Sequence, residues 1–245
     1  MDNKEDKQRI NKFLAHAGVC SRRDAERMIE DGRVWIDGKR ITTPATFVTA
    51  NSRVTVDGKH VQEAGQTRVW RYYKPTGCIT THYDPQDRYT VFQDIESYNL
   101  PRVVSVGRLD INSEGLLLLT NDGEFSRHAE LPSTGWKRCY KVRVFGLLDM
   151  RALESLKSGI TIDDVNYGSI DVSVQDSQPR GLNHWLMMTL SEGKNREIRK
   201  IMNHLGLQVS RLIRSSYGPF SLDPLSPHEV QEIPSDLVQK SFSHK

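Results

Sequence analysis

The chain has 245 residues, of which 27% are charged and 37% hydrophobic, and its formal net charge is +3. No apolar run approaches the ~18 residues that a membrane-spanning helix needs, and the charged start MDNKEDKQR is unlike a signal peptide. We therefore expect a cytoplasmic protein with no membrane partner, and a chain long enough to form two domains.

The cysteines and histidines give no sign of a disulfide or a metal site. Cys20, Cys78 and Cys139 lie far apart in the chain, which fits reduced thiols in a cytoplasm. The eight histidines are scattered, without the His/Cys spacing of a zinc site. We expect neither a disulfide nor a bound metal.

The basic residues form two clusters. Residues 7–59 contain eleven Lys and Arg against six Asp and Glu, a surplus of +5. Residues 193–214 contain six basic residues against Glu197 alone, again +5. Two such clusters are typical of a chain that binds a polyanion at two places. Charge alone fits two solvated faces equally well.

The N-terminal cluster begins with two predicted helices. Their apolar positions recur at helical spacing and are Ile10, Phe13, Leu14, Ala17, Ala25, Met28 and Ile29. Gly18 ends the first helix and Gly32 ends the second. Ser21 occupies the N-cap position of the second helix, with Asp24 three residues later. The segment predicts a helix-turn-helix.

Two predicted β-hairpins follow the helices. The first has strands at residues 34–36 and 39–41, and the second has strands at 54–56 and 59–61. An Asp-Gly pair, a strong signal for a tight turn, separates the strands of each hairpin. A small domain of two helices and short strands is therefore expected.

This arrangement resembles the αL RNA-binding domain first known from a small-subunit ribosomal protein. The stretch RINKFLAHAGVCSRRDAERMIEDGRVWIDGKRI carries the Ser-Arg-Arg helix start and the Gly-x-Val-x-Ile-x-Gly-Lys strand pair, and the resemblance covers residues 7–66. Helix N-terminal amides and arginines suit RNA phosphates. The expected RNA contacts are Arg22, Arg23, Lys39 and Arg40. A DNA-binding helix-turn-helix is the alternative, but such motifs seldom continue into two hairpins.

A second domain, residues 67–240, is expected after a small polar linker at 63–67. It opens with a strand pattern at 69–73 that Lys-Pro-Thr-Gly interrupts. Later patterns predict strands at 140–145 and 185–190 and a helix at 197–205. This mixture predicts an α+β domain with a largely antiparallel sheet.

Within this domain a charged loop runs directly into an apolar strand, in the stretch SVGRLDINSEGLLLLTNDGEF at 105–125. The four leucines at 116–119 predict a buried strand, which Asn-Asp-Gly ends. Asp110 in the loop is either an ordinary turn residue or a carboxylate that the strand holds in place for chemistry. The surrounding motifs decide between these.

Four motifs occur in order: KPTG at 74–77, VGRLDINSEGLLLLTNDGE at 106–124, KRCYKVRV at 137–144 and SEGKNREIRKIMNHLG at 191–206. Together they resemble the ordered motifs of bacterial ribosomal-RNA pseudouridine synthases, in which an αL domain precedes a catalytic domain. The resemblance implies a mainly antiparallel mixed sheet with a central cleft. GKNREIRK and VSRLIRSSYGPFSL favour the large-subunit branch of that family.

The resemblance implies that the protein isomerises uridine to pseudouridine in ribosomal RNA, free or within an assembling particle. Such an enzyme cleaves the bond from ribose to N1 of uracil, turns the base and rejoins it through C5. The reaction has no redox or phosphoryl-transfer step, so we expect no cofactor. A monomer is expected.

The same resemblance assigns the site. Asp110 matches the catalytic aspartate, as a nucleophile or as the base that starts glycal formation. Burial alone raises the pKa of a carboxyl group, and Arg199 matches the arginine that pairs with this aspartate. Tyr140 matches the tyrosine that stacks on one face of the flipped uracil, and Ile198 is expected to pack on the other face of the base. Arg108 is expected to fill the space that the flipped base leaves. Expected phosphate contacts are Lys194, Arg196, Lys200 and Arg214.

Two rival classes remain. A non-catalytic RNA-binding or ribosome-assembly protein could share the first domain, but the set Asp110, Tyr140 and Arg199 argues against it. A DNA-binding regulator would show a dimerisation stripe, which we do not find in the sequence. Lys74 and Pro75 are expected to shape the edge of the cleft without taking part in the chemistry.

Overall fold

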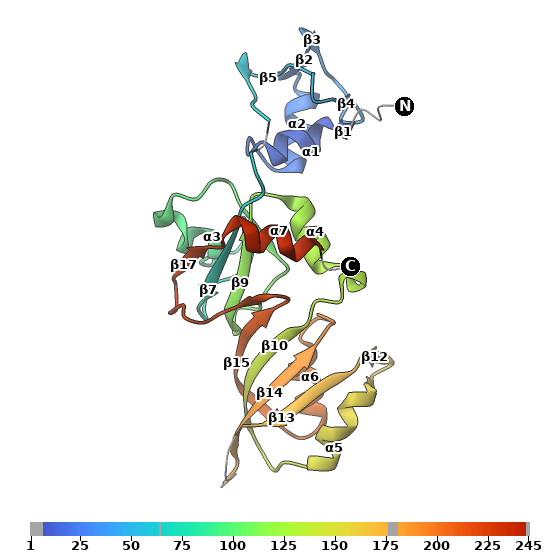
Figure 1. Cartoon of the computed structure of the whole chain (residues 1–245), viewed down its shortest axis with the longest axis vertical. Coiled ribbons are helices and arrows are strands. Elements are labelled where there is room, and N and C mark those ends of the chain that lie inside the picture. The colour runs from blue at the N-terminus through green and yellow to red at the C-terminus, as the bar shows by residue number, and fades with distance from the viewer. Residues whose placement is uncertain (1–6, 64, 176–180, 244–245) are drawn as a thin grey trace. The chain divides into compact units, whose positions relative to one another are not determined.

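The computed structural model of the protein describes residues 7–63, 65–175 and 181–243. The chain forms two compact units (Figure 1). The second consists of Arg68–Leu100, Ser105–Thr120 and the residues from Glu124 onward, and the first takes the remainder. No helix among the described residues is long and apolar enough to cross a membrane.

The first unit contains both predicted helices and both predicted hairpins. Its elements are β1 (Gln8–Arg9), α1 (Ile10–His16), α2 (Arg22–Glu30), β2 (Val34–Ile36), β3 (Lys39–Arg40), β4 (Phe47–Val48), β5 (Val54–Val56) and β6 (Lys59–His60). The strand order β3-β2-β5-β6 is antiparallel throughout. Ser21 caps α2 as predicted, since its hydroxyl accepts a hydrogen bond from the backbone NH of Asp24 at 3.1 Å.

The core of the first unit follows from the apolar spacing. Ile10 and Leu14 of α1 and Ile29 of α2 are fully buried and pack against Val34 and Val54 of the hairpins. Burying an aliphatic side chain contributes about 1.5–3 kcal/mol. This cluster therefore gives the first unit a hydrophobic core of its own.

The second unit is built on a nine-stranded sheet. Its strands are β7 (Val69–Lys74), β8 (Val104–Val106), β9 (Glu114–Thr120), β10 (Arg138–Phe145), β13 (Ile170–Val174), β14 (Asn183–Leu190), β15 (Gln208–Tyr217), β16 (Phe220–Ser221) and β17 (Val230–Glu232). Along the order β13-β14-β10-β15-β9-β7-β17, only β15 and β9 pair in parallel. The predicted α+β fold with a mixed, mainly antiparallel sheet is confirmed.

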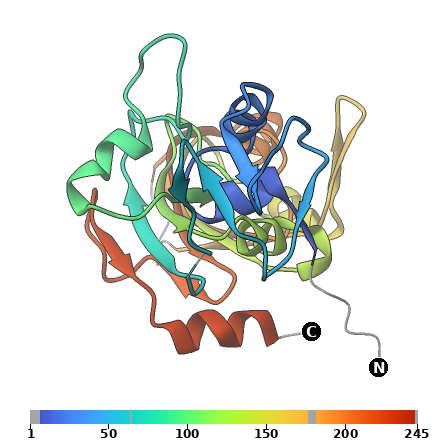
Figure 2. The same cartoon turned by 90° about the horizontal axis from the view of Figure 1, so that it is seen from above.

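The helices of this unit are short. They are α3 (Val91–Asp94), α4 (Gly123–Glu130), α5 (Met150–Ser155), α6 (Glu197–His204) and α7 (Ser235–Ser243), with 3-10 turns at Glu96–Tyr98, Pro132–Thr134 and Leu156–Ser158. A small separate hairpin joins β11 (Ile160–Ile162) to β12 (Val165–Tyr167). In this unit α7, red in Figure 2, forms an outer layer beside the strands.

Strand β9 lies at the centre of the unit, and all seven of its residues are buried. Leu116 and Leu118 join a core cluster with Phe125 of α4 and Val238 of α7. Because successive side chains of a strand point to opposite faces, Leu117 and Leu119 face the other side. A strand covered on both faces needs apolar residues at every position. This explains the unbroken leucine run.

The three cysteines are free thiols, as predicted. Cys20 and Cys78 are buried, and Cys139 is half-buried. Burial raises the pKa of both Cys20 and Cys78, so these thiols are shielded and unreactive.

Gly115 lets β9 approach β15. It has φ +103°, and a Cβ atom at this position would lie 2.4 Å from the carbonyl oxygen of Arg214. We predict that Gly115→Ala lowers the free energy of unfolding by about 3 kcal/mol, because it adds backbone strain and a clash. Gly123→Ala is the control, because an added Cβ at this position meets nothing within 4 Å. It should change the free energy of unfolding by about 0.5 kcal/mol or less. Equal unfolding transitions in the two variants would contradict this explanation.

Candidate active site

The loop that carries Asp110 connects β8 to β9 and is fastened by Lys74. This lysine ends β7 and has no exposed surface. Its Nζ donates hydrogen bonds to the carbonyl oxygens of Asp110 at 3.1 Å, Ser113 at 2.8 Å and Pro75 at 2.9 Å. Burial lowers the pKa of the Lys74 ammonium, while nearby groups, Asp110 and Glu114 among them, oppose that change. The hydrogen bonds to three carbonyl oxygens offset the cost of burying the charged ammonium group.

The other carbonyls of the loop are held as well. The hydroxyl of Thr80 donates to the carbonyl of Leu109 at 2.9 Å, and the backbone NH of Gly77 donates to the carbonyl of Ile111 at 2.9 Å. Arg199 Nη2 donates to the carbonyl of Asn112 at 2.8 Å. Every backbone carbonyl from residue 109 to 113 therefore accepts a hydrogen bond. The segment 74–80, which contains the KPTG motif, supplies most of the donors.

Arg196 is the cation nearest to the Asp110 carboxylate. Its Nη1 lies 3.6 Å from Asp110 Oδ2, and the two side chains are 48% and 39% exposed. An exposed ion pair of this kind contributes at most about 1 kcal/mol to stability. Arg196 precedes α6 with φ +52°, a left-handed conformation that is unfavourable for a residue other than glycine. A strained residue that faces a carboxylate in a cavity is typical of a functional site.

Arg199 does not form the ion pair expected with Asp110. Its Nη1 donates to the carbonyl of Val209 at 3.1 Å, and its Nη2 donates to the carbonyl of Asn112. Burial lowers the pKa of its guanidinium, and its Nε is buried without a partner. Arg199 thus fixes the backbone of the loop, and Arg196, expected only as a phosphate contact, faces the carboxylate.

A cavity of about 620 Å³ opens beside the loop. The sequence-predicted residues that line it are Arg108, Asp110, Tyr140, Lys194, Arg196, Ile198, Arg199 and Arg214. Tyr140 on β10 and Ile198 in the first turn of α6 are buried and supply apolar wall. The structure therefore brings the predicted aspartate, tyrosine and isoleucine to one cavity.

Arg214 is not the surface phosphate contact expected from the sequence. It is 3% exposed, and its Nε donates to the carbonyl of Leu116 at 2.8 Å. Its guanidinium lies 5.0 Å from the ring centre of Tyr217, and its Nη2 is buried without a partner. Because Tyr140 pairs with Arg214 in the sheet, this cation belongs to the cavity wall.

Two further lining residues were missed in the sequence. Arg138 lies over the ring of Tyr217 at 4.7 Å and donates to its hydroxyl at 2.9 Å. Glu197 is 4% exposed, and burial raises the pKa of its carboxyl group. Its Oε2 accepts from the backbone NH of Lys194 at 2.9 Å, and its Oε1 has no partner. The sequence offered one signal for this contact: Glu197 stands in the first turn of the predicted helix, where an acidic side chain often accepts from a backbone NH just before the helix.

The remaining predicted basic residues are at the surface. Arg108 is exposed at the cavity rim, and Lys200 is exposed on α6 outside the lining set. Lys194 pairs with Glu192 and lies 5.8 Å from the ring centre of Tyr167. Among the described residues no group of three His, Cys, Asp or Glu could hold a metal ion.

In the first unit, Arg22 and Arg23 are exposed at the start of α2, and Lys39 is exposed on β3. Arg40 is partly engaged, because its guanidinium donates to the carbonyls of Gly32 at 3.0 Å and Asp31 at 3.1 Å. These bonds close the C-terminal end of α2, so Arg40 has a structural contact that the sequence did not reveal.

Comparison with known proteins identifies the family. A family model described as RNA pseudouridylate synthase matches residues 68–204, and the S4 domain model matches residues 8–54. A protein named as an uncharacterized RNA pseudouridine synthase of Rickettsia felis is 46% identical over 95% of this chain and 100% of its own length. The ribosomal large subunit pseudouridine synthase B of Yersinia pestis is 40% identical over 88% of this chain and 69% of its own.

A solved structure described as a pseudouridylate synthase shares the fold, with a TM-score of 0.67 and 22% identity over 95% of this chain and 99% of that one. The chain belongs to the RNA pseudouridine synthase family. It is an isomerase that carries an N-terminal S4 domain, the αL RNA-binding domain predicted above. The predicted family and enzyme class are confirmed.

The contacts of Lys74 predict a positioning role. Lys74→Met keeps an unbranched side chain of similar length but removes three hydrogen bonds, so the free energy of unfolding should fall by about 2 kcal/mol. Because the Asp110 loop would shift, kcat for pseudouridine formation should fall about 100-fold with a much smaller change in KM. Lys157→Met, at an exposed lysine, is the control. Steady-state kinetics and thermal melting measure both effects, and wild-type kcat in Lys74→Met would contradict the assigned role.

Proposed function

We propose that this protein converts a specific uridine of large-subunit ribosomal RNA to pseudouridine, with Asp110 as its catalytic group. The observation that carries the proposal is the position of Asp110: its side chain is 39% exposed in the cavity wall, on a loop in which the backbone carbonyls of residues 109–113 all accept hydrogen bonds. Catalysis by a positioned group needs such fixed geometry. The large-subunit substrate is supported by the relative from Yersinia pestis.

The chemistry breaks the bond between C1′ of ribose and N1 of uracil and forms a bond between C1′ and C5. The C5 proton is lost and N1 gains one, so atoms and charge balance with no cofactor. The Asp110 carboxylate would either attack C1′ or remove a proton from C2′. In both routes Arg196, whose Nη1 lies 3.6 Å from Asp110 Oδ2, would orient the carboxylate.

The walls of the cavity fit a uracil ring turned out of its helix. Tyr140 and Ile198 offer an aromatic and an aliphatic surface beside Asp110, and a base of any sequence can stack on an aromatic ring through its π-face. Arg108, exposed at the rim, would occupy the space that the flipped nucleotide leaves. Lys194 and Arg196 would add contacts to the flanking phosphates.

We also propose a division of labour between an RNA-binding domain at 7–66 and a catalytic domain at 67–240. In the first, Arg22 and Arg23 flank the capped N-terminus of α2 and Lys39 is exposed, an arrangement that suits phosphates of folded RNA. The enzyme would act as a monomer in the cytoplasm, where ribosomal RNA is made.

Substitution of Asp110 tests the catalytic assignment. Asp110→Asn keeps the size but removes the charge and the nucleophilic oxygen, and Asp110→Glu displaces the carboxylate by a methylene. We expect both variants to fold and to bind ribosomal RNA, with kcat reduced at least about 1,000-fold. Purified protein and ribosomal RNA, analysed by carbodiimide mapping of pseudouridine, provide the measurement.

Asp163→Asn is the matched control, because Asp163 is an exposed turn residue with φ +49°, a conformation that asparagine tolerates well. This control should keep wild-type activity. Pseudouridine formed by Asp110→Asn at a near wild-type rate would show that Asp110 is only a turn residue.

The stacking role of Tyr140 is tested by two substitutions. Tyr140→Phe keeps the ring and should bind RNA almost as well as the wild type, whereas Tyr140→Ala should lose about 1–3 kcal/mol of base stacking. Binding is measured by titration with ribosomal RNA, with thermal melting alongside because Tyr140 is buried. If both variants bind RNA equally, Tyr140 serves the core and not the base.

A further inference from the structure

One half of the large sheet has a covered face and an open face. In β10 and β14 the buried residues alternate with exposed or half-buried ones, so that Val142 and Val144 are buried while Lys141 and Arg143 are exposed. On the neighbouring strands, α6 packs against β15 and α5 against β13. Figure 1 shows α6 behind β10 and β14, with no described helix in front of these strands.

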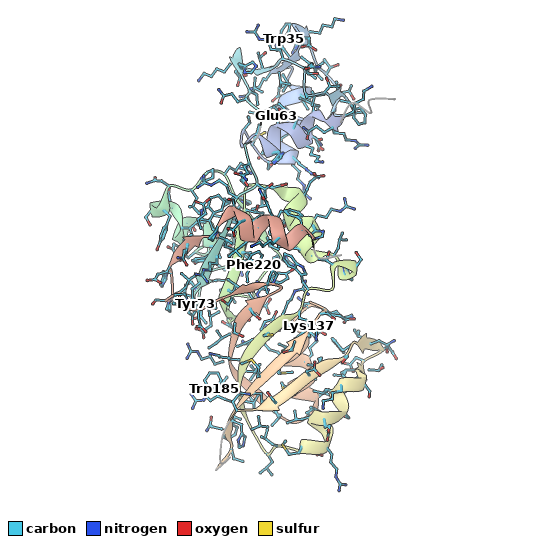
Figure 3. The ribbon with its side chains drawn as sticks, viewed as in Figure 1. Trp35, Glu63, Tyr73, Lys137, Trp185 and Phe220 are labelled. Carbon is cyan, nitrogen blue, oxygen red and sulfur yellow. The ribbon has the colours of Figure 1, made fainter. Side chains whose placement is uncertain are left out.

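The open face is basic. Lys141 and Arg143 stand two residues apart on β10, about 7 Å along the strand. Arg143 pairs with Trp185 on β14 and with Arg211 on β15, and Lys141 pairs with Met187. Trp185, labelled in Figure 3, is half-buried and packs against the core, so the floor beside the cations is apolar.

In the described part of the chain, acidic groups on this face are few. Glu114 is 8% exposed and is occupied by Arg211, which donates to its two carboxylate oxygens at 2.6 and 3.0 Å. Asp171 lies on β13, two strands away from β10. The side chains of Lys141 and Arg143 form no salt bridge or hydrogen bond with any described residue, although the backbone carbonyl of Arg143 accepts from the Ser210 hydroxyl at 3.2 Å. Arg143 lies opposite Arg211 in the sheet, and because Glu114 compensates only Arg211, an external anion would add a partner for Arg143.

This face is separate from the cavity. Tyr140 and Leu212 line the cavity, and Tyr140 and Lys141 are consecutive in a strand, so their side chains point to opposite faces of the sheet. Neither Lys141 nor Arg143 is among the lining residues. A target uridine held at Asp110 would therefore not reach them.

We propose that Lys141 and Arg143, with Arg211 beside them, form a further RNA-binding surface, apart from the cavity, for phosphates remote from the target uridine. The inference rests on the proposed ribosomal RNA substrate, because only a large RNA can reach both faces of the sheet. The unpaired side chains of Lys141 and Arg143 beside the apolar surface of Trp185 suit a phosphodiester backbone, which contributes affinity through charge and without sequence specificity. An acidic protein is the other possible occupant, and the test separates the two.

The test compares two pairs of substitutions that remove the same charge. Lys141→Gln with Arg143→Gln alters the proposed surface. Arg151→Gln with Lys157→Gln alters exposed basic residues at α5 and is the control. Binding to full-length large-subunit ribosomal RNA and to a short RNA hairpin is titrated over a range of salt concentrations, and pseudouridine formation is scored separately.

For the long RNA, the slope of log K against log salt should become shallower by about 1.5–2 in the Lys141/Arg143 variant, since each phosphate contact contributes about 0.9. The control pair should keep the wild-type slope, and hairpin binding should be unchanged in both. Unchanged binding of long RNA by the Lys141/Arg143 variant would overturn the proposal and favour an acidic protein. An equal loss with the hairpin would also overturn it, because the contacts would then belong to the cavity. Neither outcome depends on whether pseudouridine forms, so failure of the proposed function is scored independently.

Discussion

The structure of the site depends on the fixation of five consecutive backbone carbonyls, residues 109–113. A buried carbonyl without a donor costs about 1–3 kcal/mol, so a loop that is short of donors would rearrange. Here Lys74 alone serves two of the five, and Thr80, Gly77 and Arg199 serve the others. With its backbone held in this way, the Asp110 side chain lines the cavity on a fixed loop, as its proposed catalytic role requires.

The strands around this loop place the rest of the site. β9 is buried on both faces, and Gly115 allows its close parallel pairing with β15. β15 in turn pairs with β10, which brings Tyr140 next to Arg214. The leucine run is therefore the rigid support for the chemistry as well as the core of the unit. Because the loop runs into β9 and Tyr140 lies on β10 of the same sheet, the sheet sets their separation.

Much of the fold could be predicted from local patterns. The Asp-Gly turns fixed the two hairpins, Ser21 with Asp24 marked the start of α2, and the unbroken leucines indicated a strand buried on both faces. These features depend on neighbours in the sequence. The candidate site came instead from the order of four motifs, which located Asp110, Tyr140 and Ile198 in one cavity.

The cations of the site could not be predicted in the same way. Arg196 and Arg199 lie on the same short motif, and it is Arg196, with its positive φ, whose side chain lies 3.6 Å from the Asp110 carboxylate. Lys74 reaches carbonyls up to 39 residues away in the chain, and Arg214 reaches one 98 residues away. Such contacts follow from tertiary packing, so a basic residue that looks like a phosphate ligand in the sequence can prove to be structural.

The central claim is that the fixed Asp110 carboxylate modifies one uridine of ribosomal RNA. The most direct measurement is carbodiimide mapping of ribosomal RNA from a strain that lacks the gene, complemented with wild-type protein or with Asp110→Asn. We expect a pseudouridine in the large-subunit RNA to disappear on deletion, to return with the wild type and to stay absent with Asp110→Asn. A complete set of pseudouridines in the deletion strain, or its restoration by Asp110→Asn, would contradict the claim.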